Sequence, residues 1–284
     1  MIRALTLTLA LLLATPVTAQ TGAQTGAQTS SLESLTRRDQ VLGWEAVGRI
    51  DMGNGGYCTG TLIAPDLVLT AAHCLFDSRT QAPYDPAQIQ FRAGLRDDKI
   101  IATGRVRRAV AHPGYPPFSP VTTNSIAHDV ALLELSEPIP AGRAAPFAIA
   151  AAATGAQISV VSYARARDDA PSWQRSCNIS KQDAAILSFD CDVDHGASGA
   201  PVFDLSMGRA KIISIISSGR REKTRTVSYG MRLPDHVDTL KAALRSGKGV
   251  ILAKGDAPLA QIRRIGVGTQ TGTSARFVKA RTTP

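Results

Sequence analysis

Short apolar or alternating runs of residues dominate the chain from about Val41 onward. Gly, Pro, Asn and Asp separate these runs. Many short runs with turn residues between them predict an all-β barrel or sandwich, not alternating β and α units. The expected strands are Gly60–Ile63, Leu67–Thr70, Ile89–Ala93, Arg105–Ala111, Val130–Leu135, Gln157–Ser162, Ala184–Asp190, Pro201–Phe203, Lys211–Ile216 and Thr226–Met231.

A segment rich in proline and alanine, Glu137–Gly155, divides the strand-rich region into two similar halves. Its alanine run is also compatible with a short helix. We therefore expect two β units, an N-terminal one over residues 41–140 and a second one over residues 141–247.

One helix is expected after the last strand. Asp235 stands where it can cap the first turn, and Gly247 stands where the helix would end. The apolar positions with helical spacing are Leu233, Val237, Leu240 and Leu244. This pattern predicts a terminal helix packed on the β body.

Residues 1–19 have the organisation of a secretory signal peptide. Arg3 supplies a basic start, Ala4–Ala14 form an apolar run, and Val17–Ala19 have the small-residue spacing that a signal peptidase accepts. A membrane span needs about 18 or more continuous apolar residues, and Thr15–Pro16 interrupts this run. The protein is therefore predicted to be secreted or periplasmic, with no membrane span.

Residues 20–40 offer little that a core could bury. A short repeat between Gln20 and Gln28 leads into a Ser- and Thr-rich stretch, which is typical of a flexible linker or a propeptide. Arg37–Arg38 is a candidate processing site, although dibasic pairs are also common in solvated linkers.

The formal net charge of +9 first suggests a nucleic acid or an anionic surface as a partner. The charge is unevenly placed, however. Residues 20–240 carry 22 Lys and Arg against 22 Asp and Glu, whereas residues 241–284 carry 9 basic residues against Asp256 alone. The excess lies in a basic C-terminal extension, residues 248–284. This extension suits attachment to an anionic surface, or is simply solvated, and shows no pattern for a specific nucleic acid.

Three short windows contain the candidate chemistry. His73 ends a predicted strand pair, Asp129 stands at the entrance to a buried strand, and Ser198 lies in a glycine-flanked turn. A serine hydroxyl is a weak nucleophile near neutral pH, and an imidazole has a suitable pKa to act as its base. Each residue alone also fits a structural role in a cap or a turn.

Two other site types fit the sequence less well. The remaining histidines show no metal-site spacing, and the cysteines contain no Cys-x-x-Cys pair, so no metal or other cofactor is expected. The serine window also lacks the Gly-x-Ser-x-Gly elbow of α/β-hydrolases, whose acid follows the serine in the chain.

Export permits disulfides, and four cysteines allow three pairings. Their spacing favours Cys58 with Cys74 and Cys177 with Cys191.

Together, and in the order His, Asp, Ser, the three windows resemble the chymotrypsin-like (trypsin-fold) serine peptidases. The likeness runs from about Val47 to Leu244 and is greatest to the bacterial V8-like glutamyl endopeptidase branch. It implies two six-stranded antiparallel β-barrels with the active site between them. It also implies protein or peptide substrates. We expect the protein to be a monomer.

The resemblance assigns a role to each residue of the site. His73 would be the general base, Asp129 would hold its other ring nitrogen, and Ser198 would be the nucleophile. The backbone N–H groups of Gly196 and Ser198 would form the oxyanion hole. Ala197 replaces the aspartate that pairs with a newly cut N-terminus in trypsin-type zymogens, so activation by that ion pair is not expected.

The same resemblance suggests the residues that bind substrate. Asp192, six residues before the serine, would form the floor of the primary specificity pocket and favour cleavage after Arg or Lys. Ile216 stands where V8-like enzymes have a histidine, which disfavours glutamyl specificity. Ser217 to Gly219 would pair with an extended substrate backbone. His195 either lines the cleft or is an exposed loop residue.

The leading expectation is therefore a secreted serine endopeptidase. The alternative is a non-catalytic or latent homologue that binds a partner, with the basic extension attached to an anionic surface. The presence of His73, Asp129 and Ser198 together favours the enzyme, because a binding protein has no chemical need for all three.

Overall fold

The computed structural model describes residues 30–153, 155–206, 208–223 and 226–254. The expected signal peptide and most of the basic extension lie outside these residues, so both remain predictions. No helix within the described residues is long and apolar enough to cross a membrane.

Six antiparallel strands close into a barrel in the N-terminal half. The order is β8-β7-β2-β3-β4-β9, and β9 pairs back onto β8. A further strand, β17 (Val250–Leu252), pairs with the C-terminal half of β8. The barrel strands are β2 (Val47–Asp51), β3 (Tyr57–Ala64), β4 (Leu67–Thr70), β7 (Gln90–Ala93), β8 (Ala102–Ala111) and β9 (Ala131–Leu135).

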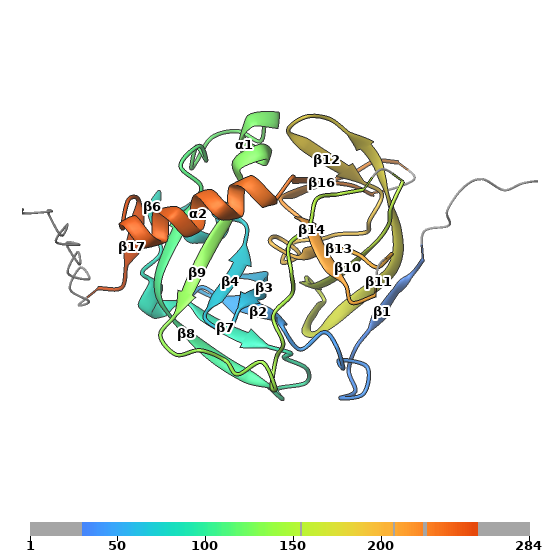
Figure 1. The fold of residues 1–284 in the computed structure, drawn as a ribbon, viewed down its shortest axis with the longest axis horizontal. Helices are drawn as coiled ribbons and strands as arrows, with labels where there is room; N and C mark the ends of the chain where they lie inside the picture. The colour runs from blue at the N-terminus through green and yellow to red at the C-terminus, as the bar shows by residue number, and fades with distance from the viewer. Residues whose placement is uncertain (1–29, 154, 207, 224–225, 255–284) are drawn as a thin grey trace, which may run out of the picture.

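A second curved sheet follows in the order β14-β13-β10-β11-β12-β16-β15, with β1 paired to β11. Figure 1 shows it beside the barrel. The strands are β1 (Leu32–Ser34), β10 (Gln157–Ala164), β11 (Arg167–Gln182), β12 (Ile186–Phe189), β13 (Pro201–Asp204), β14 (Lys211–Ile215), β15 (Ser218–Arg221) and β16 (Thr226–Met231).

The all-β class and the first six-stranded barrel are confirmed, whereas the second unit is a half-barrel sheet. Its edge strands, β14 and β15, are consecutive in the chain, and no ladder of backbone hydrogen bonds joins β14 to β16. Ser214 Oγ instead donates to Met231 O at 2.7 Å. Gly230 lies so close to Ile215 O that a Cβ would be 2.1 Å from that oxygen. A side-chain hydrogen bond and a close backbone approach therefore replace the last ladder.

The terminal helix is also confirmed. It is α2 (Pro234–Ser246), and Gly247 ends it in the left-handed conformation with φ 76°. Its expected apolar positions are buried, and Figure 1 shows the helix lying across the first barrel. Asp235 was expected to cap the helix, but it lies in the first turn and Leu233 is the N-cap residue.

One short helix was not predicted. It is α1 (Thr123–His128), which precedes Asp129 directly and begins with a capping box between Thr122 and Ser125. Its six residues are too few for a helical pattern of apolar positions. The remaining short elements are the 3-10 turns Ala72–Leu75 and Pro86–Gln88, and the hairpin of β5 (Phe76–Asp77) with β6 (Ala82–Pro83).

The expected linker over residues 20–40 is wrong for its last part. Residues 32–34 form β1 on the edge of β11, and the next residue, Leu35, is only 1% exposed. The Glu33 carboxylate also accepts a hydrogen bond from Arg175 Nε at 2.8 Å. The few apolar side chains of this segment are therefore used for docking, which the polar composition concealed.

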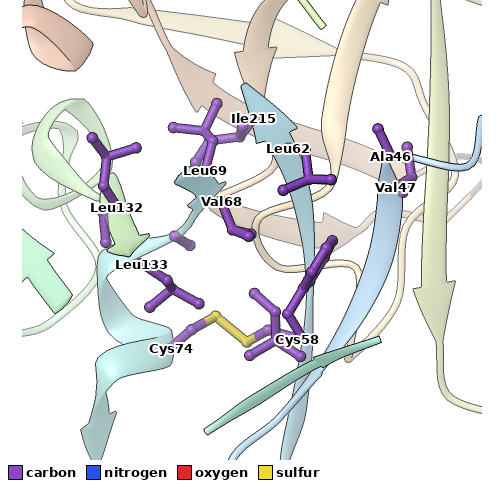
Figure 2. Close-up of a cluster of buried hydrophobic side chains, with 14 of the residues drawn as sticks. Ala46, Val47, Cys58, Leu62, Val68, Leu69, Cys74, Leu132, Leu133 and Ile215 are labelled. Atoms are coloured by element: carbon purple, nitrogen blue, oxygen red, sulfur yellow. A yellow bond between two sulfur atoms is a disulfide. The ribbon is translucent and has the colours of Figure 1, made fainter. Parts of the chain in front are cut away.

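The core of the first barrel surrounds a disulfide. Figure 2 shows the Cys58–Cys74 bridge among buried side chains that include Leu62, Val68 and Leu133. Ile215 of the second sheet belongs to the same buried cluster. The packing of the two units therefore positions the loops between them.

Candidate active site

His73 and Asp129 form a close pair. Asp129 Oδ1 accepts a hydrogen bond from the backbone N–H of His73 at 2.9 Å, and Asp129 Oδ2 lies 2.7 Å from His73 Nδ1. A carboxylate can only accept, so the proton of a neutral His73 is held on Nδ1. His73 Nε2 is then left with a free lone pair, which is the arrangement a general base requires.

Local structure fixes both side chains. His73 lies in the 3-10 turn Ala72–Leu75 that follows β4, and the Cys58–Cys74 disulfide ties this turn to β3. Asp129 follows the last residue of α1 and is only 4% exposed. The pair is therefore built from two rigid connections of the first barrel.

Ser217 joins this pair from the second sheet. Its hydroxyl donates to Asp129 Oδ2 at 2.6 Å, and its backbone N–H donates to Tyr229 O at 2.8 Å. The sequence placed Ser217 only beside the substrate backbone. No sequence signal joins it to Asp129, because the two residues are 88 positions apart.

The carboxylate controls the charge of His73. Burial disfavours the charged imidazolium, but the charge of Asp129 and its hydrogen bond outweigh burial and raise the pKa of His73 above its ordinary value of 6.5. The ring is still partly accessible, with 37% of the side chain exposed. His73 can therefore exchange protons with a group in the cleft.

Ser198 lies in a turn that the first barrel holds in place. Thr59 of β3 donates its backbone N–H to Ser198 O at 2.9 Å, and its hydroxyl donates to Gly196 O at 2.9 Å. Gly199 has φ 77°, and a Cβ there would be 2.3 Å from Thr70 Oγ1. Only glycine fits this position, because both the backbone conformation and the available space exclude a side chain.

Two backbone N–H groups of this turn are left for a ligand. Ala197 N–H donates to Asp194 O, and Gly199 N–H donates to Ile216 O. Among the described residues, the N–H groups of Gly196 and Ser198 donate to no protein acceptor. Gly196 has φ 96°, and a Cβ there would collide with the ring of Tyr57 at 2.2 Å.

One cavity brings the three predicted catalytic residues together. It has a volume of about 640 Å³, and His73, Asp129 and Ser198 all line it. Residues of the first barrel, such as Tyr57, face residues of the second sheet, such as Ser218, across it. Among the described residues, the hydrogen bonds of His73 and Asp129 do not include Ser198 Oγ. Hydrogen bonds between catalytic groups are often long or poorly aligned before substrate binds.

A family model for the trypsin-like peptidase domain matches residues 58–210, which is more than half of the chain. The chain belongs to the trypsin-like peptidase family. The match includes His73, Asp129 and Ser198, the three residues that line the cavity.

Individual relatives agree with this family. A glutamyl endopeptidase of Bacillus licheniformis is 27% identical over 156 residues, which cover 54% of this chain and 47% of that protein. Serine protease 23 of Homo sapiens is 28% identical over 196 residues, 60% of this chain and 48% of that protein. A modular serine protease of Drosophila melanogaster is 36% identical over 83 residues, 28% and 13% respectively. The chain thus matches less than half the length of these curated relatives.

Two solved structures share the fold. A Glu endopeptidase in complex with MPD superposes with a TM-score of 0.62 at 20% identity, over 75% of this chain and 95% of that one. The protease Anisep from Arthrobacter nicotinovorans superposes with a TM-score of 0.58 at 16% identity, over 75% and 99%. The trypsin-like fold accounts for the barrel, the half-barrel sheet and the cleft between them.

A second cavity of the peptidase, of about 500 Å³, adjoins Ser198. Asp192 lines neither cavity: it is exposed, and its carboxylate accepts from Thr226 Oγ1 at 3.2 Å. Its neighbour Val193 lines the cavity instead. Asp194, the next residue along the chain, also lines this cavity.

The other expected substrate-binding residues do line these cavities. Ser217 lines both, and Gly219 lines the second one. His195 is exposed and lies at the rim of both, so it borders the cleft as well as being a loop residue. Three arginines that the sequence analysis did not single out also line the second cavity: Arg165, Arg220 and Arg221.

Both disulfides of the peptidase pair as the sequence favoured. Cys58 bonds to Cys74 and Cys177 bonds to Cys191. The two described groupings of His, Cys and acidic side chains that are close enough to hold a metal each contain one of these bridges. Disulfide sulfurs are not thiolates, and a thiolate is the form of cysteine that binds a metal. Neither grouping is therefore a suitable metal site.

Proposed function

We propose that this trypsin-like peptidase is an exported serine endopeptidase that cleaves peptide bonds through an acyl-enzyme on Ser198. The observation that supports this most directly is the His73–Asp129 hydrogen bond at 2.7 Å in a cavity that Ser198 also lines. The two disulfides fit an oxidising compartment and so support export.

The mechanism follows from the positions of the protons. His73 Nε2 takes the proton of Ser198 Oγ as that oxygen attacks the substrate carbonyl carbon. Asp129 stabilises the imidazolium that forms. The N–H groups of Gly196 and Ser198 bind the oxyanion of the tetrahedral intermediate. His73 then protonates the leaving amine, and a water molecule repeats the sequence to release the acyl group.

Substrate preference follows from the second cavity. Val193 and Ile216 provide apolar walls. The charged lining residues are three arginines against one carboxylate, so positive charge is in excess: Arg165, Arg220, Arg221 and Asp194. Glu222 accepts a hydrogen bond from Arg220 at 2.8 Å, so Arg165 and Arg221 are the arginines to test first. A carboxylate side chain suits this cavity better than an Arg or Lys side chain. The proposal is therefore cleavage after acidic residues, opposite to the preference expected from Asp192.

A comparison of the mature protein with its Ser198→Ala variant on a denatured protein substrate tests the activity. We expect cuts from the parent protein only. Cleavage that survives the substitution would refute Ser198 as the nucleophile. Absence of cuts from both proteins, with both folded, would favour the binding homologue over the enzyme.

The same substrate, with its cut sites mapped by mass spectrometry, tests the preference. We expect Glu or Asp before the cut bond, and a loss of about tenfold in that preference for Arg165→Gln combined with Arg221→Gln. Arg175→Gln is the matched control, because Arg175 is an exposed arginine that pairs with Glu33 on the outside of the sheet. A preference for Arg or Lys would refute the proposed cleavage after acidic residues and leave the peptidase activity standing.

A further inference from the structure

Three histidines form a cluster beside Asp129, outside both cavities. His112 follows β8, His128 ends α1, and His236 lies near the start of α2. The ring centroids of His112 and His236 are 4.6 Å apart, and those of His112 and His128 are 4.9 Å apart. All three residues are half-buried, and none lines a described cavity.

Hydrogen bonds assign one tautomer to each ring. The backbone N–H of Gly114 donates to His112 Nδ1 at 3.1 Å, so the His112 proton is on Nε2. That Nε2–H donates to His236 Nδ1 at 3.1 Å. His128 Nδ1–H donates to the carbonyl oxygen of Asn124 at 2.9 Å. The rings of His112 and His236 are therefore neutral in this arrangement, because one nitrogen of each accepts a hydrogen bond.

A second proton on two of these rings would break the cluster. On His112 it would occupy Nδ1 and face the Gly114 N–H, and on His236 it would occupy Nδ1 and face the His112 Nε2–H. In each case two N–H groups would face each other where a donor now faces an acceptor, so the hydrogen bond would be lost. Positive charge would also accumulate between adjacent rings. Protonation and the present packing thus exclude each other.

The electrostatic environment agrees with this geometry. Burial, followed by the charges of His236 and His128, lowers the pKa of His112 to about 4. Burial and His128 also lower the pKa of His236, and Asp235 partly opposes this. The titratable groups acting on the cluster from the described elements are its own rings and Asp235.

The backbone of two cluster residues, His112 and His128, is hydrogen-bonded to the turn around Asp129. Asp129 has φ −77° and ψ 61°, and Val130 N–H donates to His128 O at 2.8 Å, which makes an inverse γ-turn centred on Asp129. The backbone N–H of His112 donates to Val130 O at 2.9 Å. The His128 ring lies against Gly114, where a Cβ would be 2.8 Å from a ring carbon.

We propose that the cluster of His112, His128 and His236 positions Asp129 while the rings of His112 and His236 are neutral, and that acidification releases the Asp129 turn and disassembles the active site. The role of Asp129 as triad acid rests on the proposed function. The positioning of Asp129 by the cluster is tested on the His73–Asp129 hydrogen bond, which can be measured without peptide cleavage.

The direction of the effect follows from the lowered pKa values. A ring released from the cluster regains its ordinary pKa of 6.5, whereas His112 in the cluster has a pKa of about 4. The assembled state is therefore fully favoured above about pH 6.5 and loses that advantage progressively as the pH falls toward about 4. Protonation of His112 and protonation of His236 each break a hydrogen bond, so we expect the transition to take up about two protons.

Proton NMR of the His73 Nδ1–H, measured in the inactive Ser198→Ala background, tests the proposal from neutral pH down to about pH 4. We expect the downfield resonance of this hydrogen-bonded proton to disappear with the uptake of about two protons. His236→Asn keeps an oxygen that can accept from His112 but cannot titrate. In this variant the loss should occur at lower pH, with the uptake of about one proton.

Thr239→Ala, on the same helix and exposed, is the matched control and should leave the transition unchanged. If His236→Asn does not fold, His112→Asn replaces it, because its side-chain oxygen can still accept from Gly114. A resonance that persists to about pH 4 would overturn the proposal, as would a transition with the same midpoint and proton count in the variant. Because the background is inactive by design, these outcomes are separate from any failure of the proposed peptidase activity.

Discussion

Ser217 Oγ donates a hydrogen bond to Asp129 Oδ2 at 2.6 Å, and the same carboxylate oxygen lies 2.7 Å from His73 Nδ1. Ser217 lies between β14 and β15 of the second sheet, whereas Asp129 and His73 lie in connections of the first barrel. The buried carboxylate therefore obtains its hydrogen-bond donors from both units. The geometry of His73 depends on how the two units pack.

Ser217→Ala tests this dependence. Hydrogen bonds to charged groups contribute about 1.5–3 kcal/mol, so we expect kcat to fall about tenfold to a hundredfold. Steady-state kinetics give the answer, and Ser218→Ala is the matched control because its hydroxyl makes no contact with Asp129. Equal losses of kcat in the two variants would show that the Asp129 contact has no special role.

The pH dependence of kcat/KM tests the charge state of His73. The pKa of His73 is raised by Asp129, and only the neutral ring can act as a base. Activity should therefore fall as the pH drops through a value above 6.5, the ordinary pKa of histidine. The free energy of unfolding should depend on pH in the opposite direction. The stabilising contribution of His73 is fully present below pH 6.5 and is lost as the pH rises through its raised pKa. An acid limb of the rate profile below 6.5 would contradict the stated electrostatics.

Gly199→Ala tests the fit of the nucleophile turn. A Cβ at Gly199 would meet Thr70 Oγ1 at 2.3 Å and Thr59 O at 2.4 Å, so we expect the free energy of unfolding to fall by about 3 kcal/mol or more. Gly43→Ala is the control, because Gly43 also has a positive φ but has nothing within 4 Å of its Cβ position. Its cost should stay near 1 kcal/mol. Denaturant unfolding that gives equal losses would rule out the close packing against Thr59 and Thr70.

Removal of each disulfide separates stability from activity. The two bridges close similar loops, with sequence separations of 16 and 14, so each double alanine variant should lose about 3 kcal/mol of unfolding free energy. Only removal of Cys58–Cys74 should also lower kcat under conditions where both variants are folded, because Cys74 adjoins His73. A comparable fall in kcat without Cys177–Cys191 would place the effect in global stability.

Local patterns in the sequence predicted much of the fold. The strands Leu67–Thr70 and Thr226–Met231 are found with the expected bounds, because apolar side chains and turn residues mark their limits. The longest strand, Arg167–Gln182, was missed because charged and polar residues fill much of it. Its buried positions depend on pairing with β10, β12 and β1, which no local pattern encodes.

The candidate site shows the same division. Residue types and chain order indicated His73, Asp129 and Ser198, because the chemistry requires those groups. The contacts of Thr59 with the Ser198 turn and of Ser217 with Asp129 join residues far apart in the chain, so the sequence could not reveal them. The pocket role expected for Asp192 stays a prediction. The alternating Asp190, Asp192 and Asp194 leave open in the sequence which carboxylate faces the pocket, and the structure places Asp194 in the lining of the second cavity.

Covalent labelling of Ser198 tests the central claim most directly. A fluorophosphonate reacts with a serine hydroxyl only where a neighbouring base activates it. We expect peptide mapping by mass spectrometry to find one label per folded molecule, on Ser198, and to find none in His73→Ala or in urea-unfolded protein. A folded parent protein that takes no label on Ser198, or that is labelled equally well without His73, would contradict the account.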